Sequence, residues 1–366
     1  MRASKIAEYL VKVYETQQHV KGRRLSVILL GPPGVGKTVS VREAANVIAQ
    51  KLGVPLVEDG RGEGFHFLAF SVLHLDPVDF SGVPRDAGDV VSYKPIDIFE
   101  KLLKPDARGI LFLDEFTLDD RTDRRAALLK LVDEGYLGYR RLSAGVMVVL
   151  AGNTSEWSRL AQELDEPMRR GRARIIFVDP PTLEEWLEYM NVTYHDKWDR
   201  RVGAYLSLYP DELFTKSDSA ADAGYGPLNS PRNFTNLAVT LPLLDDPELV
   251  EQEVRSLLDS QTATKLLTFL NTYVPPVEDI AASPKMWTSL TREAKYLLIS
   301  QLSQREDFDI FSELYRLLAD SDHESLILLR VLQTDQRRQK FTEYLRRHQP
   351  SVFKVLVDIV KRGDEV

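Results

Sequence analysis

One stretch, LSVILLGPPGVGKT at residues 25–38, constrains the fold more than any other part of the sequence. It begins with an almost unbroken apolar run to Leu30, which is typical of a parallel strand buried on both faces. From Gly31 to Thr38 the chain fits the P-loop pattern G-x-x-x-x-G-K-[ST] at every position. Apolar residues then recur at helical spacing until Gly53 and Pro55, which end the predicted helix.

This order of strand, glycine-rich loop and helix predicts a binding site for a nucleoside triphosphate. Backbone N–H groups of the loop and the positive end of the helix would surround the phosphates. Gly34 and Gly36 let the backbone approach closely, because a Cβ would intrude. We expect Lys37 to reach the β- and γ-phosphates and the Thr38 hydroxyl to bind Mg²⁺. A glycine turn that matches by chance is the alternative, and the flanking elements argue against it. The expected nucleotide contacts are Gly31, Pro32, Pro33, Gly34, Val35, Gly36, Lys37, Thr38 and Val39.

Composition narrows the class of protein. The 366 residues allow two or three domains, with 43% hydrophobic and 28% charged residues. A net charge of −8 argues against a dedicated nucleic-acid binder, although it does not exclude a local basic patch. The absence of cysteine excludes disulfides, zinc thiolates and cysteine nucleophiles. No apolar run approaches the roughly 20 residues of a membrane span, and the first residues do not resemble a signal peptide, so we expect a cytoplasmic protein.

A second apolar run, residues 109–113, ends in two carboxylates, Asp114 and Glu115. Downstream of an intact P-loop this is the Walker B arrangement. The first carboxylate holds Mg²⁺, directly or through water, and the second polarises an attacking water. A strand that merely ends in acids is the alternative. We therefore expect Thr38 and Asp114 at the metal and Glu115 as the catalytic base.

Three further apolar runs complete a predicted sheet, at residues 65–75, 146–151 and 175–178. Asn153 follows the second of these runs, where its side chain would hold the attacking water or touch the γ-phosphate. The alternative is a turn asparagine, which loops favour for local reasons. Five buried strands alternating with helices predict a doubly wound parallel sheet with the nucleotide at the carboxyl ends of its strands.

The sequence also predicts the structure of several segments outside these strands. Residues 6–14 favour an opening helix that packs beside the nucleotide domain or contacts a neighbouring subunit. Residues 76–95, rich in glycine and proline, are interpreted as an irregular insertion, and residues 136–143 as a short hairpin. Beyond Leu241, apolar stripes at helical spacing predict an all-helical region over residues 242–366.

In this order the motifs resemble an AAA+ ATPase, and more closely the MoxR-like branch. GPPGVGKT is similar to the Walker A motif of the family, LFLDE to its Walker B, and Gly152–Asn153 to its sensor 1. The segment DFSGVP at residues 79–84 resembles the one that MoxR-like proteins carry before an insertion in the second helix. SPRNF at residues 230–234 resembles sensor 2, with a serine cap, a proline at the first helical position and then Arg232. The resemblance covers about residues 21–241.

The resemblance implies ATP and Mg²⁺ as cofactors and a P-loop NTPase sheet of strand order 5-1-4-3-2. It implies an α/β nucleotide-binding domain over residues 1–179 and a helical lid over residues 180–241, followed by the helical region over residues 242–366. It also implies that Arg232 contacts the nucleotide and acts in catalysis as sensor 2.

The resemblance further implies a homo-oligomeric ring, usually a hexamer, with an arginine finger near the start of the fifth strand. The finger would reach the γ-phosphate bound by the neighbouring subunit. The family usually shows an arginine followed by phenylalanine, whereas this chain has MRRGRA at residues 168–173. We expect Arg172 to be the finger, with Arg170 as the second choice and Arg169 as the third. The alternative for each of them is a solvated surface arginine.

The leading functional interpretation is an ATP-hydrolysing ring that remodels or activates a partner protein, as a chaperone does. By resemblance, the client would carry a von Willebrand factor A domain. One alternative is a nucleotide-gated assembly module with little turnover, against which Glu115 and Asn153 argue. Another is a nucleic-acid-linked motor, against which the acidic charge balance argues.

Overall fold

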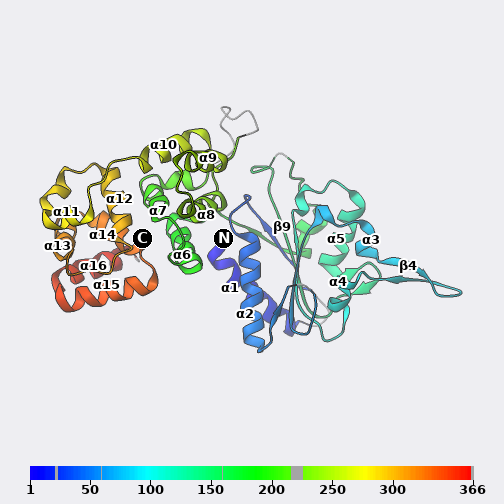
Figure 1. The fold of residues 1–366 in the computed structure, drawn as a ribbon. Coiled ribbons are helices and arrows are strands. Elements are labelled where there is room, and N and C mark those ends of the chain that lie inside the picture. Colours follow the sequence, from blue (N-terminus) through cyan, green and yellow to red (C-terminus); the bar gives the residue numbers. More distant parts are fainter. Residues whose placement is uncertain (21–23, 59, 159, 216–225, 364–366) are drawn as a thin grey trace. The chain divides into compact units, whose positions relative to one another are not determined.

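The computed structural model describes residues 1–20, 24–58, 60–158, 160–215 and 226–363. Contacts within the chain divide it into two units, Met1–Pro180 and Pro181–Val366. The first unit contains a parallel sheet covered by helices, and we call it the P-loop unit. The second contains only helices and their connections in its described residues, and we call it the helical unit (Figure 1).

Six parallel strands form the central sheet of the P-loop unit, in the order β10-β1-β9-β6-β3-β2. Counted along the chain, the five predicted strands lie in the order 5-1-4-3-2, which confirms the expected topology. The short strand β2, at the edge beside β3, was not predicted. The strands are β1 (Val27–Leu30), β2 (Leu56–Val57), β3 (Phe65–Ser71), β6 (Arg108–Asp114), β9 (Gly145–Gly152) and β10 (Arg174–Phe177).

Helices cover both faces of this sheet, which explains why its central strands are almost wholly apolar. On one face, Ile28 and Leu30 of β1 form a core cluster with Leu128 and Leu131 of α5. Alternate residues of a strand point to the opposite face, where α1 and α2 lie side by side (Figure 1). The helices of this unit are α1 (Ala3–His19), α2 (Lys37–Leu52), α3 (Pro77–Ser81), α4 (Asp97–Glu100) and α5 (Thr122–Glu134).

Two predicted segments differ from the structure. The strand predicted over residues 65–75 ends at Ser71, whose side chain accepts a hydrogen bond from the Leu73 N–H and begins a 3₁₀ turn. The segment at residues 76–95 is not irregular, because it contains the short helix α3 and a hairpin that extends from the unit (Figure 1). The hairpin strands, β4 (Val83–Asp86) and β5 (Val91–Lys94), are largely exposed, so they lack the apolar alternation by which a half-buried strand is predicted.

The hairpin predicted at residues 136–143 is present as β7 (Tyr136–Leu137) and β8 (Arg140–Arg141). Its tip contacts the longer hairpin, since the ring centroids of Tyr93 and Tyr139 are 4.6 Å apart.

The helical unit buries one continuous core that includes Tyr205, Trp287, Phe311 and Phe341. Residues on both sides of Leu241 contribute to this core, and the predicted division between a lid and a C-terminal domain stays a prediction. None of the helices in the described ranges combines the length and apolar character needed to cross a membrane. The helices are α6 (Leu183–Tyr194), α7 (Arg200–Leu208), α8 (Pro231–Thr240), α9 (Pro247–Leu257), α10 (Ser260–Leu270), α11 (Val277–Ala282), α12 (Arg292–Leu302), α13 (Ser312–Ser321), α14 (His323–Leu332), α15 (Asp335–His348) and α16 (Pro350–Gly363).

A buried ion pair fixes the chain just after β3. The Arg124 guanidinium on α5 lies 2.7 Å from the carboxylate of Asp119, whose side chain is fully buried. Arg124 also donates hydrogen bonds to the carbonyl oxygens of Val72, at 3.1 Å, and Leu75, at 3.0 Å. Removal of one partner of a buried pair leaves an uncompensated charge inside the protein, and this is strongly destabilising.

We therefore expect Arg124→Ala to lower the free energy of unfolding of the P-loop unit by about 3–5 kcal/mol. The control is Arg121→Ala, which removes an arginine side chain that is 45% exposed and paired with Asp123 at 2.9 Å. An exposed pair of this kind contributes less than about 1 kcal/mol. Urea unfolding followed by circular dichroism measures both effects, and equal losses in the two variants would contradict the assignment.

Candidate functional site

The loop between β1 and α2 has the backbone conformation that its glycines allow. Gly34 and Gly36 have φ values of 78° and 91°, in the left-handed region that favours glycine. A Cβ on Gly31 would lie 2.4 Å from the carbonyl oxygen of Val178, so the loop could not pass this close to the end of β10 with a side chain there. Helix α2 begins at Lys37, and its first N–H groups are therefore available at the loop.

Lys37 is 7% exposed, and its ammonium lies within the loop. It donates hydrogen bonds to the carbonyl oxygens of Gly31, at 2.9 Å, and Pro32, at 2.8 Å. A third acceptor is the side-chain oxygen of Asn153, at 3.3 Å. A buried ammonium needs such partners, and here they hold the cation where the P-loop motif places the β- and γ-phosphates.

Thr38 and Asp114 lie next to each other at the same edge of the sheet. The Thr38 hydroxyl donates a hydrogen bond of 2.9 Å to the Asp114 carboxylate. A hydroxyl and a carboxylate are the oxygen ligands that suit Mg²⁺, which also takes oxygens from phosphates and water. The residues therefore fit the predicted ion. The described residues contain no group of three His, Cys, Asp or Glu side chains that could hold a metal, and Mg²⁺ bound with a nucleotide requires none.

Glu115, the predicted catalytic base, is exposed and has an unusual backbone conformation. Its φ of 61° lies in the left-handed region, which is costly for a residue with a side chain and is often found at functional sites. Its N–H donates to the Asp114 carboxylate at 2.9 Å, and its own carboxylate accepts a hydrogen bond of 2.5 Å from the Ser71 hydroxyl. Ser71 lies opposite Asp114 in the pairing of β3 with β6. Ser71 was not predicted as a site residue, because the predicted strand continues past it to residue 75.

Asn153 directly follows β9, the strand between β1 and β6. Its side chain contacts Lys37, as described above, and its backbone N–H donates a 2.9 Å hydrogen bond to the Thr117 hydroxyl. Thr117 was also missed, since nothing in the local sequence distinguishes it from an ordinary residue after a Walker B strand. The structure thus brings together the predicted residues of the P-loop, the two carboxylates and Asn153.

The arginines predicted as finger candidates are exposed, around a kink at Gly171 with a φ of 95°. Arg172 forms an ion pair of 3.0 Å with Asp133 of α5, and Arg170 pairs with Glu166. Both arginines line a surface hollow of about 360 Å³ with Glu166 and Pro167. No ion pair of Arg169 occurs within the described part of the chain.

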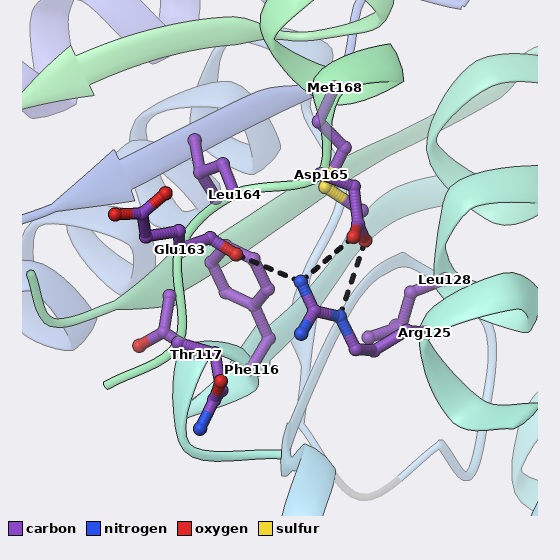
Figure 2. Close-up of a pocket in the computed structure, with 9 residues that line it drawn as sticks. Phe116, Thr117, Arg125, Leu128, Glu163, Leu164, Asp165 and Met168 are labelled. Carbon is purple, nitrogen blue, oxygen red and sulfur yellow. Dashed lines mark hydrogen bonds and ion pairs between the residues drawn. The ribbon is translucent and has the colours of Figure 1, made fainter. Parts of the chain in front are cut away.

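The segment that precedes these arginines is attached to α5 (Figure 2). The Arg125 guanidinium forms two hydrogen bonds with the Asp165 carboxylate, of 2.9 and 3.3 Å. It also donates to the carbonyl oxygen of Glu163 at 2.8 Å. The backbone carbonyl of Asp165 in turn accepts the N–H groups of Met168 and Arg169. The arginine run is therefore anchored to the helix that follows the Walker B strand.

Arg232 lies in the helical unit, where the local prediction is confirmed. Helix α8 begins with Pro231, and the Ser230 hydroxyl caps it by accepting the Asn233 N–H at 3.2 Å. Arg232 is exposed in the first turn. Its contact with a nucleotide in the P-loop unit stays a prediction.

Comparison with known proteins agrees with this geometry. Residues 27–180 match the family model described as "ATPase family associated with various cellular activities (AAA)". The P-loop unit is therefore similar to an AAA domain over residues 27–180, which are less than half of the chain. The MoxR-like branch stays a prediction. No curated protein matches the chain significantly.

Two solved structures from Aeropyrum pernix were also found. The ORC1 protein in complex with DNA is 14% identical, with a TM-score of 0.41 over 98% of this chain and 83% of that chain. The ORC2 protein, in ADPNP and ADP complexes, is 14% identical, with a TM-score of 0.40 over 98% of this chain and 94% of that chain. The expectation that this chain has no nucleic-acid partner stays a prediction.

The position of Lys37 predicts that Lys37→Ala weakens nucleotide binding. The substitution removes a charge-assisted contact to phosphate, which corresponds to about 10- to 100-fold in affinity. Lys51→Ala is the matched control, because Lys51 lies at the other end of α2 with a 51% exposed side chain that pairs with Glu15. Titration calorimetry with ATP and Mg²⁺ gives both affinities. Equal affinity in the Lys37 variant and the parent protein would exclude this lysine as a phosphate ligand.

Proposed function

We propose that this chain hydrolyses ATP in a Mg²⁺-dependent reaction and uses the cycle to remodel a partner protein. The convergence of Lys37, Thr38, Asp114, Glu115 and Asn153 at one edge of the sheet is the observation that carries the proposal. A protein that only bound a nucleotide would need Lys37, Thr38 and Asp114, but not Glu115 or Asn153. A carboxylate and an amide beside them are the groups that activate and position a water.

In the proposed reaction the oxygen of a water attacks the γ-phosphorus of ATP, and the bond to the oxygen between the β- and γ-phosphates breaks. Glu115 accepts a proton from the water, and Asn153 orients it. Lys37 stabilises negative charge on the γ-phosphoryl group. Thr38 and Asp114 would hold Mg²⁺, which neutralises phosphate charge when it is bound. The products are ADP and inorganic phosphate.

Glu115→Gln tests this assignment most directly. The amide cannot accept the proton, so we expect the turnover number to fall by about 10²- to 10⁴-fold while ATP affinity is retained. Glu134→Gln, at the exposed end of α5, is the control for the loss of one carboxylate. Phosphate release measures turnover. If the parent protein and Glu115→Gln hydrolyse ATP equally slowly, the chain is a nucleotide-gated assembly module instead.

The Glu115→Gln variant, held in the ATP state, can also be used to identify the partner as the molecule that co-purifies with it. The hairpin of β4 and β5 supports a protein partner, because Val90 and Val91 beside its turn are 64% and 63% exposed. Its place after α3 agrees with the insertion expected of the MoxR-like branch, whose proposed client is a von Willebrand factor A domain protein. Co-purification of nucleic acid in place of a protein would favour the nucleic-acid-linked motor.

We further propose that the site is completed in a ring, as a hexamer, by an arginine from the neighbouring subunit. Arg172 stays the first choice and Arg170 the second. Both are exposed and each pairs with an accessible carboxylate, Asp133 or Glu166, so exposure does not separate them. In the assembled ring Arg172 would exchange Asp133 for the neighbour's γ-phosphate. We also propose that Arg232, in the helical unit, senses the γ-phosphate of the nucleotide bound by its own chain.

Mixing experiments test whether the site is shared. Arg172→Ala alone should bind ATP normally and lose most of its turnover, since an arginine supplied in trans is worth about 10³- to 10⁵-fold. Mixed with the Lys37→Ala protein it should regain activity, because some interfaces then combine an intact P-loop with an intact finger. Arg170→Ala and Arg169→Ala are tested in parallel. The absence of rescue for every arginine, in rings shown to exchange subunits, would contradict the proposal.

A further inference from the structure

We propose that Thr117 is a positioning residue that holds Asn153 in place for hydrolysis. This inference rests on the proposed ATPase function. Thr117 lies in the 3₁₀ turn Phe116–Leu118, two residues after Glu115, and is 3% exposed. Its burial and its contacts distinguish it from an ordinary turn residue.

Two hydrogen bonds of Thr117 join the turn to the chain that follows β9. The Thr117 hydroxyl accepts the backbone N–H of Asn153 at 2.9 Å. The Thr117 carbonyl oxygen accepts the N–H of Gln162 at 2.6 Å. Thr117 therefore contacts Asn153 and Gln162, and Figure 2 shows it beside Phe116 among the residues that line a pocket.

Packing around Thr117 reinforces the hydroxyl contact. A Cβ placed on Gly152 would lie 2.6 Å from both the Thr117 methyl carbon and its hydroxyl oxygen. The threonine thus packs directly against the backbone at the end of β9, which a side chain on residue 152 would prevent. A valine at position 117 would preserve this shape and lose only the acceptor, so shape and hydrogen bonding can be tested separately.

Thr117 affects the nucleotide site through the orientation of the Asn153 side chain. Its side-chain oxygen lies 3.3 Å from the Lys37 ammonium, and the direction of that side chain depends on the backbone that Thr117 holds. Without the hydroxyl acceptor, the Asn153 N–H loses its partner and the amide can reorient. A small misplacement of a group that orients a reactant costs up to about 100-fold in rate.

The first experiment compares Thr117→Val with Thr117→Ser. We expect Thr117→Val to lower kcat by about 10- to 100-fold, with the ATP affinity within about twofold of the parent, because no phosphate ligand is lost. Thr117→Ser keeps the acceptor and should restore kcat to within about threefold of the parent. Thr16→Val is the matched control, since Thr16 is exposed and its hydroxyl donates to the Lys12 carbonyl within α1, and its kcat should be unchanged. Equal kcat values in Thr117→Val and Thr117→Ser would overturn the proposal.

A double-mutant cycle then asks whether Thr117 acts through Asn153. In an Asn153→Ala background, Thr117→Val should lower kcat by no more than about twofold, since residues that act as a unit are not additive. If the two effects multiply, Thr117 acts elsewhere and the proposal fails.

Amide hydrogen exchange provides a readout that does not depend on turnover. The Asn153 N–H should exchange at least about tenfold faster in Thr117→Val than in Thr117→Ser, because only the serine keeps its acceptor. Unchanged exchange would overturn the positioning role even if kcat fell. A parent protein without ATPase activity would refute the proposed function, whereas the exchange result would still decide whether Thr117 holds Asn153.

Discussion

The hydrogen bond between Thr38 and Asp114 joins the start of α2 to the end of β6, and the order of the strands in the sheet makes that contact possible. The two residues follow strands that are not neighbours, because β9 lies between β1 and β6. They meet because parallel strands end at one edge of the sheet and each crossover helix returns the chain to the opposite edge. Glu115 comes directly after Asp114, and Asn153 directly follows β9, the strand between β1 and β6. One choice of strand order thus places all of these side chains together.

The parts of this arrangement that local sequence encodes were predictable, and the strand order followed from the family resemblance. The contacts that depend on the register between strands were not predictable. A strand buried on both faces must be apolar, and a phosphate loop must have glycine where φ is positive, so β1, the loop and β6 were recognisable. Strands β4 and β5 are exposed, and no burial pattern marks them. Ser71 and Thr117 acquire their contacts with Glu115 and Asn153 only from the register of β3 on β6 and the position of β9.

An arginine finger must leave its ion-pair partner within its own subunit before it can reach the nucleotide of a neighbouring subunit. Arg172 and Asp133 have side chains that are 42% and 36% exposed. A pair this exposed contributes at most about 1 kcal/mol. A bidentate contact between a guanidinium and a phosphate is stronger than this, particularly where a subunit interface excludes water. If Arg172 is the finger that we propose, we therefore expect the exchange of Asp133 for the neighbour's γ-phosphate to be favourable.

The backbone of Glu115 explains why the turn after β6 has to be held so firmly. A left-handed conformation costs a residue with a side chain about 1–3 kcal/mol and persists only where surrounding contacts determine it. Here Asp114 accepts the Glu115 N–H, and Ser71 donates to the carboxylate. Thr117, two residues later, is fixed to Asn153 and Gln162. Because these contacts come from β3, β6 and the segment after β9, the conformation of Glu115 depends on the same strand order that brings Thr38 to Asp114. The proposed base and the proposed water-orienting amide are therefore positioned as one unit.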